Sequence, residues 1–325
     1  MAGPTGRPVT ASVAVEGRTV LVEASAICGL GVLPDGRTAP LTATSRGIGQ
    51  AIRYALAGEA DTIVLALGRV ATTDGGAGLL QSLGAVLARA DGTPIGPGGR
   101  GLAALHTVDP GEARAALAGV DLVLATNVDN PLLEARGTAA VYGPQKGATD
   151  NDVRELDAAL TGFVRRLEAA GVPDAAGLAR TAGAGAAGGL GYAGMLLGGR
   201  GCSGADCFLT LLGADELLAD ADFVVTGEGS LDEQSLSGKL PVALARRAQQ
   251  GVPEHAVAGR RTLPPERTAA HFRSVQALTD LTDQDCATDS ALSAQLLTRY
   301  GRALADRWIG GSGEEAVSAA RLTLT

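Results

Sequence analysis

Hydrophobic and polar positions along this chain follow two periods, which predict strands and helices in alternation. Two short apolar runs, 11–16 and 19–23, flank Gly17 and indicate a β-hairpin. Continuous apolar runs predict buried strands at 62–67, 121–126, 221–226, 256–258 and 274–278. Apolar residues spaced three and four apart predict helices at 46–57, 79–88, 151–170, 240–249 and 287–308.

This alternation predicts an α/β protein with a largely parallel sheet. In open α/β sheets, ligands bind outside the carboxyl ends of the strands. Acidic residues stand in the polar segments that follow three of the predicted strands: Asp74, Asp129, Glu228 and Asp232. The repeated placement of carboxylates where chemistry usually occurs predicts an enzyme.

Composition and charge narrow the class of protein. The formal net charge of −8 disfavours a general nucleic-acid binder, which normally presents a basic face. The charge-free segment 182–199 is mostly Ala and Gly, too weakly hydrophobic for a membrane span. No apolar signal-peptide core opens the chain, so we expect a cytoplasmic protein with no membrane partner.

Cysteine and histidine do not predict a metal centre. The four cysteines form no C-x-x-C pair and only three histidines are present, so a structural zinc site is not expected. The cysteines are interpreted as scattered reduced thiols.

Lysine is almost absent from the chain. Of 27 basic residues only Lys146 and Lys239 are lysine, and both stand in glycine-rich segments. A lysine kept against a strong bias toward arginine suggests a compact ammonium that a guanidinium cannot replace. The alternative is chance survival on a solvated loop.

One set of motifs suggests a different enzyme, an NAD(P)-dependent short-chain reductase. The segment after Thr44 resembles its glycine turn, and Tyr142 stands four residues before Lys146. A nucleotide-binding glycine turn follows a buried strand, however, and 32–43 has the composition of a loop. Pro144 lies between Tyr142 and Lys146 and disfavours the continuous helix that this pair needs. The reductase therefore stays a lesser alternative.

Six motifs in order along the chain resemble the glycerate kinase family, whose members phosphorylate glycerate at the 2-hydroxyl. They are Thr44–Gly49, Thr73–Gly78, Val128–Leu132, Gly143–Ala148, Gly183–Gly191 and Thr226–Lys239. The resemblance implies a two-domain α/β fold, with 1–204 carrying glycine-rich anion-binding loops and 205–309 forming the C-terminal part of a Rossmann-like domain. Residues 310–325 are expected to be a flexible tail.

The resemblance also implies phosphoryl transfer from ATP, with Mg²⁺, to a small hydroxy acid such as glycerate, and a homo-oligomer stays open. Catalysis would use Asp74, Asp129, Glu228, Asp232 and Lys239, of which Asp129, Glu228 and Asp232 are candidate Mg²⁺ ligands. Residues expected to bind substrate or nucleotide are Thr44, Ser45, Gly75, Gly76, Asn130, Lys146, Gly183, Gly185, Gly188, Gly189, Thr226, Gly227, Ser230 and Gln234.

The chain also departs from the family pattern. Family members begin with a further stretch, and without it the Rossmann-like domain is expected to be incomplete at its N-terminal side, with an exposed sheet edge. Ser230 stands where the family has an arginine that could hold an anion, and Arg69 stands where it usually has glycine. A paralogue with a changed substrate or without catalysis is therefore the main alternative.

Overall fold

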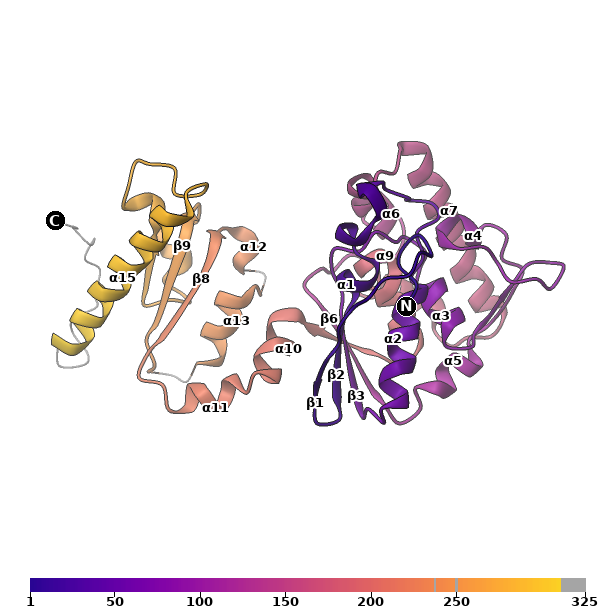
Figure 1. The fold of residues 1–325 in the computed structure, drawn as a ribbon, viewed down its shortest axis with the longest axis horizontal. Coiled ribbons are helices and arrows are strands. Elements are labelled where there is room, and N and C mark those ends of the chain that lie inside the picture. The colour runs from indigo at the N-terminus through magenta and orange to yellow at the C-terminus, as the bar shows by residue number, and fades with distance from the viewer. Residues whose placement is uncertain (237, 249–250, 311–325) are drawn as a thin grey trace. The chain divides into compact units, whose positions relative to one another are not determined.

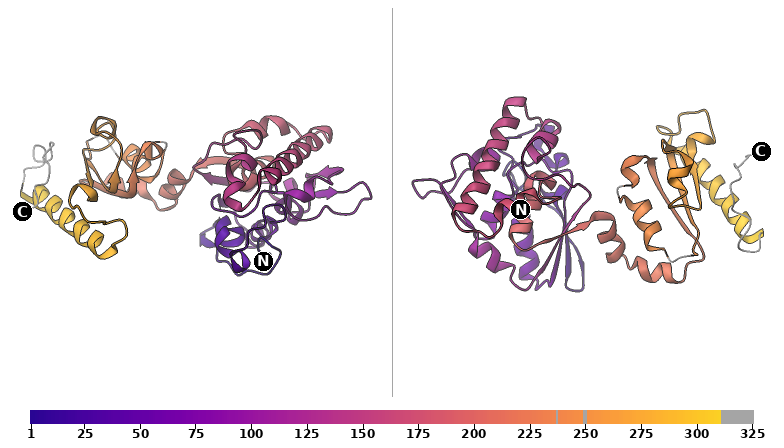
Figure 2. Two further views of the ribbon diagram at one scale, coloured as in Figure 1. Left: turned by 90° about the horizontal axis from the view of Figure 1, so that it is seen from above. Right: turned by 180° about the vertical axis from the view of Figure 1, so that it is seen from behind.

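The computed structural model describes residues 1–236, 238–248 and 251–310 (Figures 1 and 2). The chain divides into two compact units, Met1–Cys202 and Ser203–Thr325, called unit 1 and unit 2 below. All of the expected tail except Gly310 lies outside the described residues.

Unit 1 is built around a five-stranded sheet in the order β1-β2-β3-β6-β7. β1 and β2 form the antiparallel hairpin expected from the sequence, whereas β2, β3 and β6 run parallel. A small antiparallel pair, β4 and β5, lies apart from this sheet. The strands are β1 (Ala14–Glu16), β2 (Thr19–Glu23), β3 (Thr62–Ala66), β4 (Val86–Ala88), β5 (Thr107–Asp109), β6 (Asp121–Thr126) and β7 (Arg200–Ser203).

The longest helix of unit 1, α7, shows how the pattern of the sequence produces the fold. Thr149 and Asp152 form a reciprocal capping box at its start. Leu156, Leu160 and Phe163 lie on one face and are fully buried, because residues three and four apart share a helix face. The α-helices are α1 (Ala24–Cys28), α2 (Arg46–Ala57), α3 (Ala77–Ser82), α4 (Gly98–Leu102), α5 (Gly111–Ala116), α6 (Thr138–Tyr142), α7 (Asp150–Ala169), α8 (Ala175–Arg180) and α9 (Ala186–Leu196).

Helix α9 lies within the charge-free segment 182–199, which was not expected to span a membrane. It lies in the core of unit 1. Tyr192 of α9 is fully buried, packs edge-on against Phe163 with ring centroids 6.1 Å apart, and donates to the Ala175 carbonyl. Among the described residues, no helix is long and apolar enough to cross a membrane.

Unit 2 contains a parallel three-stranded sheet in the order β10-β9-β8. Successive side chains of β9 point to opposite faces. Ala256 and Ala258 pack with Val242 of α13, whereas Val257 packs in the cluster that holds Leu296 of α15. The elements are α10 (Gly204–Leu211), α11 (Ala214–Ala219), β8 (Val224–Leu231), α12 (Glu233–Leu236), α13 (Leu240–Arg247), β9 (Glu254–Arg261), α14 (Pro265–Thr268), β10 (Ser274–Ala277) and α15 (Ser290–Gly310).

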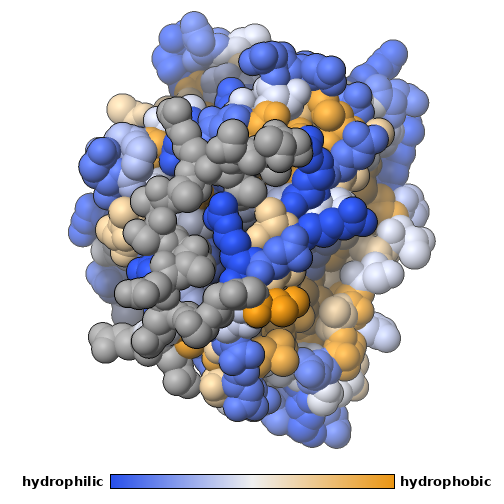
Figure 3. All heavy atoms as spheres, turned by 90° about the vertical axis from the view of Figure 1, so that its left-hand side faces the viewer, coloured by the Kyte–Doolittle hydropathy of each residue, from blue (hydrophilic) through white to orange (hydrophobic). Residues whose placement is uncertain are grey.

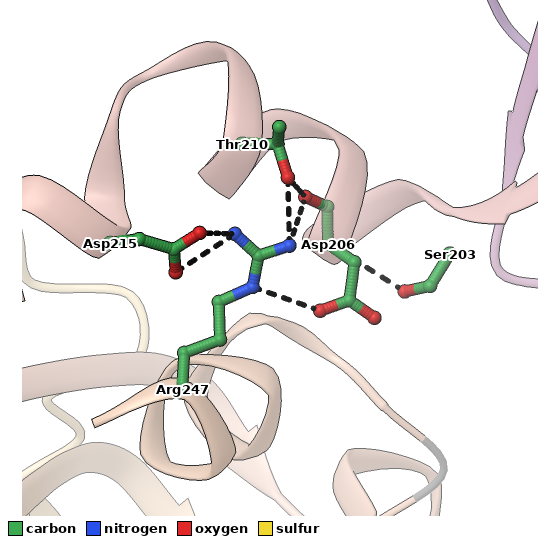
Figure 4. A network of polar contacts seen from close by, with 5 residues as sticks. All are labelled: Ser203, Asp206, Thr210, Asp215 and Arg247. Carbon is green, nitrogen blue, oxygen red and sulfur yellow. Dashed lines mark hydrogen bonds and ion pairs between the residues drawn. The ribbon is translucent and has the colours of Figure 1, made fainter. Parts of the chain in front are cut away.

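A single arginine connects the first helices of unit 2 to α13 (Figure 4). The Arg247 guanidinium donates to the Asp206 carbonyl and to Thr210 Oγ1, both at 2.8 Å, and its Nη1 lies 3.5 Å from Asp215. Ser203 caps α10 by accepting from the Asp206 amide.

On the face that carries α15, hydrophobic residues form small separate groups between hydrophilic ones (Figure 3).

Most of the predicted elements are confirmed, including helix 46–57 with its expected bounds, but two predictions are wrong. The expected helix 79–88 ends at Ser82, and Gly84 at φ +102° turns the chain into β4 instead. The strand predicted at 221–226 begins at Val224 and continues to Leu231, so residues 226–231 of the last motif lie inside the strand. Gly227 permits this, because a Cβ there would stand 2.5 Å from the Val257 carbonyl oxygen of β9.

Candidate functional site

The polar segments that follow β3 and β6 meet at the carboxyl edge of the unit 1 sheet. These two strands are parallel neighbours, so the segments after them emerge side by side. The glycine-rich segment 183–189 joins them: Gly75 N donates to Gly188 O at 3.0 Å, and Gly185 N donates to Asn130 O at 2.9 Å. Three motifs that are distant in sequence therefore form one cluster.

Asp74 lies at the centre of this cluster and has no exposed surface. Its carboxylate accepts from the amide and hydroxyl of Ser45, both at 2.8 Å, and from the amides of Gly76 at 3.1 Å and Gly78 at 3.3 Å. Burial raises the pKa of Asp74, and the hydrogen bonds from Ser45, Gly78 and Gly76 oppose that rise. The carboxylate thus holds together the starts of α2 and α3.

Lys146 is the second enclosed charge of unit 1, with 3% exposure. Its Nζ donates to the Thr72 carbonyl at 2.6 Å and lies 3.4 Å from Thr73 Oγ1. Burial lowers the pKa of Lys146 to about 8, while Cys28 and Asp74 nearby act in the opposite direction. A compact ammonium suits this enclosed position, whereas a guanidinium would bring five donors into it.

Two glycines of segment 183–189 allow the backbones of the cluster to approach closely. Gly188 has φ +72°, and a Cβ there would stand 1.9 Å from the Thr72 carbonyl oxygen. Gly189 has φ +92°, and its Cβ would stand 2.6 Å from Gly75 Cα. Gly183 and Gly76 also have positive φ and are buried in the same cluster, as is Thr44. Side chains larger than hydrogen are therefore excluded from this contact.

Asn130 and Asp129 follow β6 but have different surroundings. Asn130 is partly buried: its Oδ1 accepts from Tyr142 OH at 2.6 Å and its Nδ2 donates to Arg136 O at 2.9 Å. The Asp129 side chain is 77% exposed and lies 3.6 Å from the Arg136 guanidinium. Tyr142 ends α6 while Lys146 lies in the next, 3-10 turn, so these two do not share the helix face that a reductase would need.

Unit 2 carries a separate charged cluster where β8 ends and α13 begins. Lys239 is the N-cap residue of α13, and its Nζ lies 3.7 Å from Glu228 Oε2 and 3.7 Å from Asp232 Oδ1. Thr226 and Gly227 lie earlier on β8, with Thr226 buried. The two carboxylates thus share one ammonium at the carboxyl end of a parallel strand, where ligands of open α/β sheets collect.

The two carboxylates of this cluster are held differently. Asp232 accepts from the Gln234 amide at 3.0 Å and from Ser230 Oγ at 3.3 Å. Desolvation raises the pKa of Asp232, but Lys239 and these hydrogen bonds outweigh it, so the pKa lies below its usual value. Glu228 Oε1 is buried and has no hydrogen-bond partner among the described residues. An orphaned carboxylate oxygen beside a half-buried lysine is suited to a cation or a donor from a ligand.

One residue near this cluster was not predicted from the sequence. Arg260 of β9 pairs in register with Ser230 of β8, and its Nε donates to Ser230 Oγ at 3.1 Å. No local motif marks Arg260, because its proximity to the cluster comes only from the pairing of two strands.

Polar clusters at the carboxyl ends of parallel strands, with enclosed and half-buried charges, define an enzyme of the open α/β class. The chain belongs to the glycerate kinase family, a family of phosphotransferases: the profile described as "Glycerate kinase family" matches residues 1–308. The fold and family expected from the six motifs are confirmed.

Two relatives with curated names and a solved structure agree with this assignment. The chain is 37% identical to the glycerate kinase of Halalkalibacterium halodurans over 79% of this chain and 68% of that protein. It is 38% identical to the glycerate 2-kinase of Escherichia coli K12 over 76% of this chain and 65% of that protein. The crystal structure of a protein assigned as glycerate kinase 2 from Salmonella typhimurium LT2 matches with a TM-score of 0.78 at 33% identity, covering 94% of this chain and 80% of that one. These comparisons support phosphorylation of glycerate and give no support to a reductase.

Proposed function

We propose that this chain transfers a phosphoryl group from ATP to a hydroxyl of glycerate or a related small hydroxy acid. The observation that carries the proposal is Lys239 placed 3.7 Å from both Glu228 and Asp232 at the end of β8. Phosphoryl transfer depends on positioning anionic reactants and neutralising charge on the transferred group. A lysine ammonium at a helix start, flanked by carboxylates that hold it in place, supplies such a charge.

The carboxylates of the unit 2 cluster fit a Mg²⁺ ion. Mg²⁺ is usually held by one or two carboxylates together with water and substrate phosphates. Glu228, with its unpartnered Oε1, and Asp232, whose pKa lies below its usual value, would hold it. Asp129 is exposed and pairs with Arg136 instead. The ion would neutralise phosphate charge when bound.

The hydrogen-bonding groups around Asp232 orient that carboxylate. Ser230 and the Gln234 amide fix its two oxygens, and Lys239 stabilises its ionised form. An ionised, fixed carboxylate is able to accept a hydrogen bond from the attacking hydroxyl of a hydroxy acid and to direct it.

The unit 1 residues divide into two proposed roles. Asp74 and Lys146 are enclosed, so we assign them to holding the segments 72–76 and 143–148 in place rather than to contact with substrate. Asn130 is partly buried and Asp129 is exposed, so these two remain proposed ligand contacts. Gly183, Gly185, Gly188 and Gly189 act first by permitting close backbone packing.

The proposal is tested by measuring ADP formation from ATP and Mg²⁺ with and without D-glycerate. Glycerate-dependent ADP formation by the wild-type chain is expected, and Lys239→Ala and Asp232→Asn should each lower kcat/KM by at least about a hundredfold, as loss of a preorganised charge does. Arg267→Gln removes an exposed ion pair with Glu233 and is the matched control, expected to keep wild-type activity.

Two outcomes would contradict this assignment. Near-wild-type turnover in both Lys239→Ala and Asp232→Asn would show that the unit 2 cluster takes no part in catalysis. A folded wild-type chain that binds ATP but forms no ADP with D-glycerate would favour the alternative of a paralogue with a changed substrate.

A further inference from the structure

Arg260 shares one face of the unit 2 sheet with the charged cluster. In the parallel ladder Ser230 pairs with Arg260 and Glu228 pairs with Ala258. Side chains of register partners point to the same face, and Ala258 packs on the face covered by α13. Arg260 therefore lies on the face where α13 begins at Lys239.

A continuous chain of polar contacts joins Arg260 to this cluster. Its Nε donates to Ser230 Oγ at 3.1 Å, Ser230 Oγ lies 3.3 Å from Asp232 Oδ2, and Asp232 Oδ1 lies 3.7 Å from Lys239 Nζ. The bond through Nε fixes the plane of the guanidinium while its two terminal amino groups stay available. The Arg260 side chain is exposed, and no carboxylate partner is seen for it within the described parts of the chain.

Arg260 changes the net charge of the unit 2 cluster. Glu228 and Asp232 carry two negative charges against the single positive charge of Lys239, so the three side chains by themselves have a net charge of about −1. The guanidinium of Arg260 balances that charge from the neighbouring strand. Arg260 is the register partner of Ser230, so its guanidinium stands beside the Asp232 carboxylate that Ser230 contacts.

We infer that Arg260 is an anion-binding residue of the unit 2 cluster, whose guanidinium binds a pair of oxygens of a carboxylate or phosphate group. This inference rests on the proposed function, because the hydroxy-acid carboxylate and the ATP phosphates are the two sources of such an oxyanion. A planar guanidinium binds either one through two parallel hydrogen bonds.

The test compares Arg260→Gln with Arg261→Gln in steady-state kinetics and in calorimetric titration with MgATP and with D-glycerate. Arg261 is the adjacent residue of β9 and its guanidinium pairs with Asp280 at 3.7 Å, so it is the matched control. Arg260→Gln should raise KM and Kd for one ligand by about tenfold to a hundredfold, as loss of a charge-assisted hydrogen bond pair does. An effect on D-glycerate identifies the carboxylate as the anion, and an effect on MgATP identifies the phosphate.

An exchange of the paired residues separates binding from folding. Ser230→Arg combined with Arg260→Ser returns a guanidinium to the same face from the other strand, so it should recover at least part of the lost affinity. Arg260→Gln with both KM values and both Kd values within twofold of wild type overturns the inference while the proposed function stands. A wild-type chain that forms no ADP contradicts the proposed function, and the titrations still decide the role of Arg260; a wild-type chain that binds neither ligand overturns both.

Discussion

At the scale of single residues, the two lysines of this chain have the same side chain in opposite surroundings. Lys146 is enclosed and donates to backbone and hydroxyl oxygens, whereas the Lys239 side chain is 37% exposed between two carboxylates. Burial disfavours the charged form of an amine, and nearby carboxylates favour it. The first lysine therefore organises unit 1 at a cost in stability, and the second presents a charge that a ligand can reach.

The enclosure of Lys146 predicts an unusual dependence of stability on pH. Its pKa is about 8 in the folded chain against 10.5 for an ordinary lysine, so between these values the unfolded chain binds more protons. The free energy of unfolding must then rise with pH in that window. Urea unfolding followed by circular dichroism at pH 7 and pH 10 should show the wild type gaining about 2 to 3 kcal/mol relative to Lys146→Met.

The single tryptophan provides an internal control for this measurement. Trp308 lies in unit 2 and packs on Phe223 with ring centroids 4.9 Å apart. The unfolding transition followed by Trp308 fluorescence should therefore be the same in the wild type and in Lys146→Met. A difference that stays constant from pH 7 to pH 10 would show that the ammonium remains charged in the folded chain.

At the scale of elements, segment 183–189 illustrates a helix start whose conformation depends on glycine. Gly188→Ala places a Cβ 1.9 Å from the Thr72 carbonyl oxygen at φ +72°, so we expect a loss of at least about 2 kcal/mol in unfolding free energy. Gly162→Ala is the matched control, because nothing lies within 4 Å of that Cβ in α7. The control should gain about 0.5 to 1 kcal/mol, since alanine favours helix. Equal thermal unfolding of the two variants would contradict the packing argument.

Elements whose stability is local could be predicted from the sequence, and those that depend on distant partners could not. Helix 46–57 carries its own amphipathic pattern, so its bounds were predicted correctly. Strand β4 has three residues and exists because it pairs with 107–109, which no local pattern reveals. The extension of β8 through its glycines likewise depends on β9.

In the candidate site, too, some features could be predicted from the local sequence and others depend on distant parts of the chain. The motifs marked Asp74 and Lys146 as candidates, and the structure encloses both in the cluster of unit 1. An aspartate after a strand has the same sequence signature whether it faces solvent or, as Asp74 does, is fully enclosed. Arg260 had no signature at all, since only strand register brings it beside Ser230.

At the scale of the whole molecule, the hydrophobic cores follow the division into two units. The largest core cluster runs from Val20 to Leu197 and lies entirely in unit 1, and the cluster around Leu231 and Phe272 lies entirely in unit 2. A compact unit with its own core is able to fold alone. The prediction that residues 1–204 form a domain therefore has a direct test.

A fragment of residues 1–204 keeps all of β7 and should fold without the rest of the chain. It contains no tryptophan, so circular dichroism and the near-ultraviolet signal of buried Tyr192 would report its state. We expect cooperative urea unfolding, with Asp74→Ala destabilising the fragment by about 3 kcal/mol or more, because four donors would lose their buried acceptor. Asp91→Ala, which removes only an exposed turn contact to Thr93, should change stability by no more than about 1 kcal/mol. A fragment without cooperative unfolding would mean that the core of unit 1 needs residues beyond 204 to hold its Asp74 cluster together.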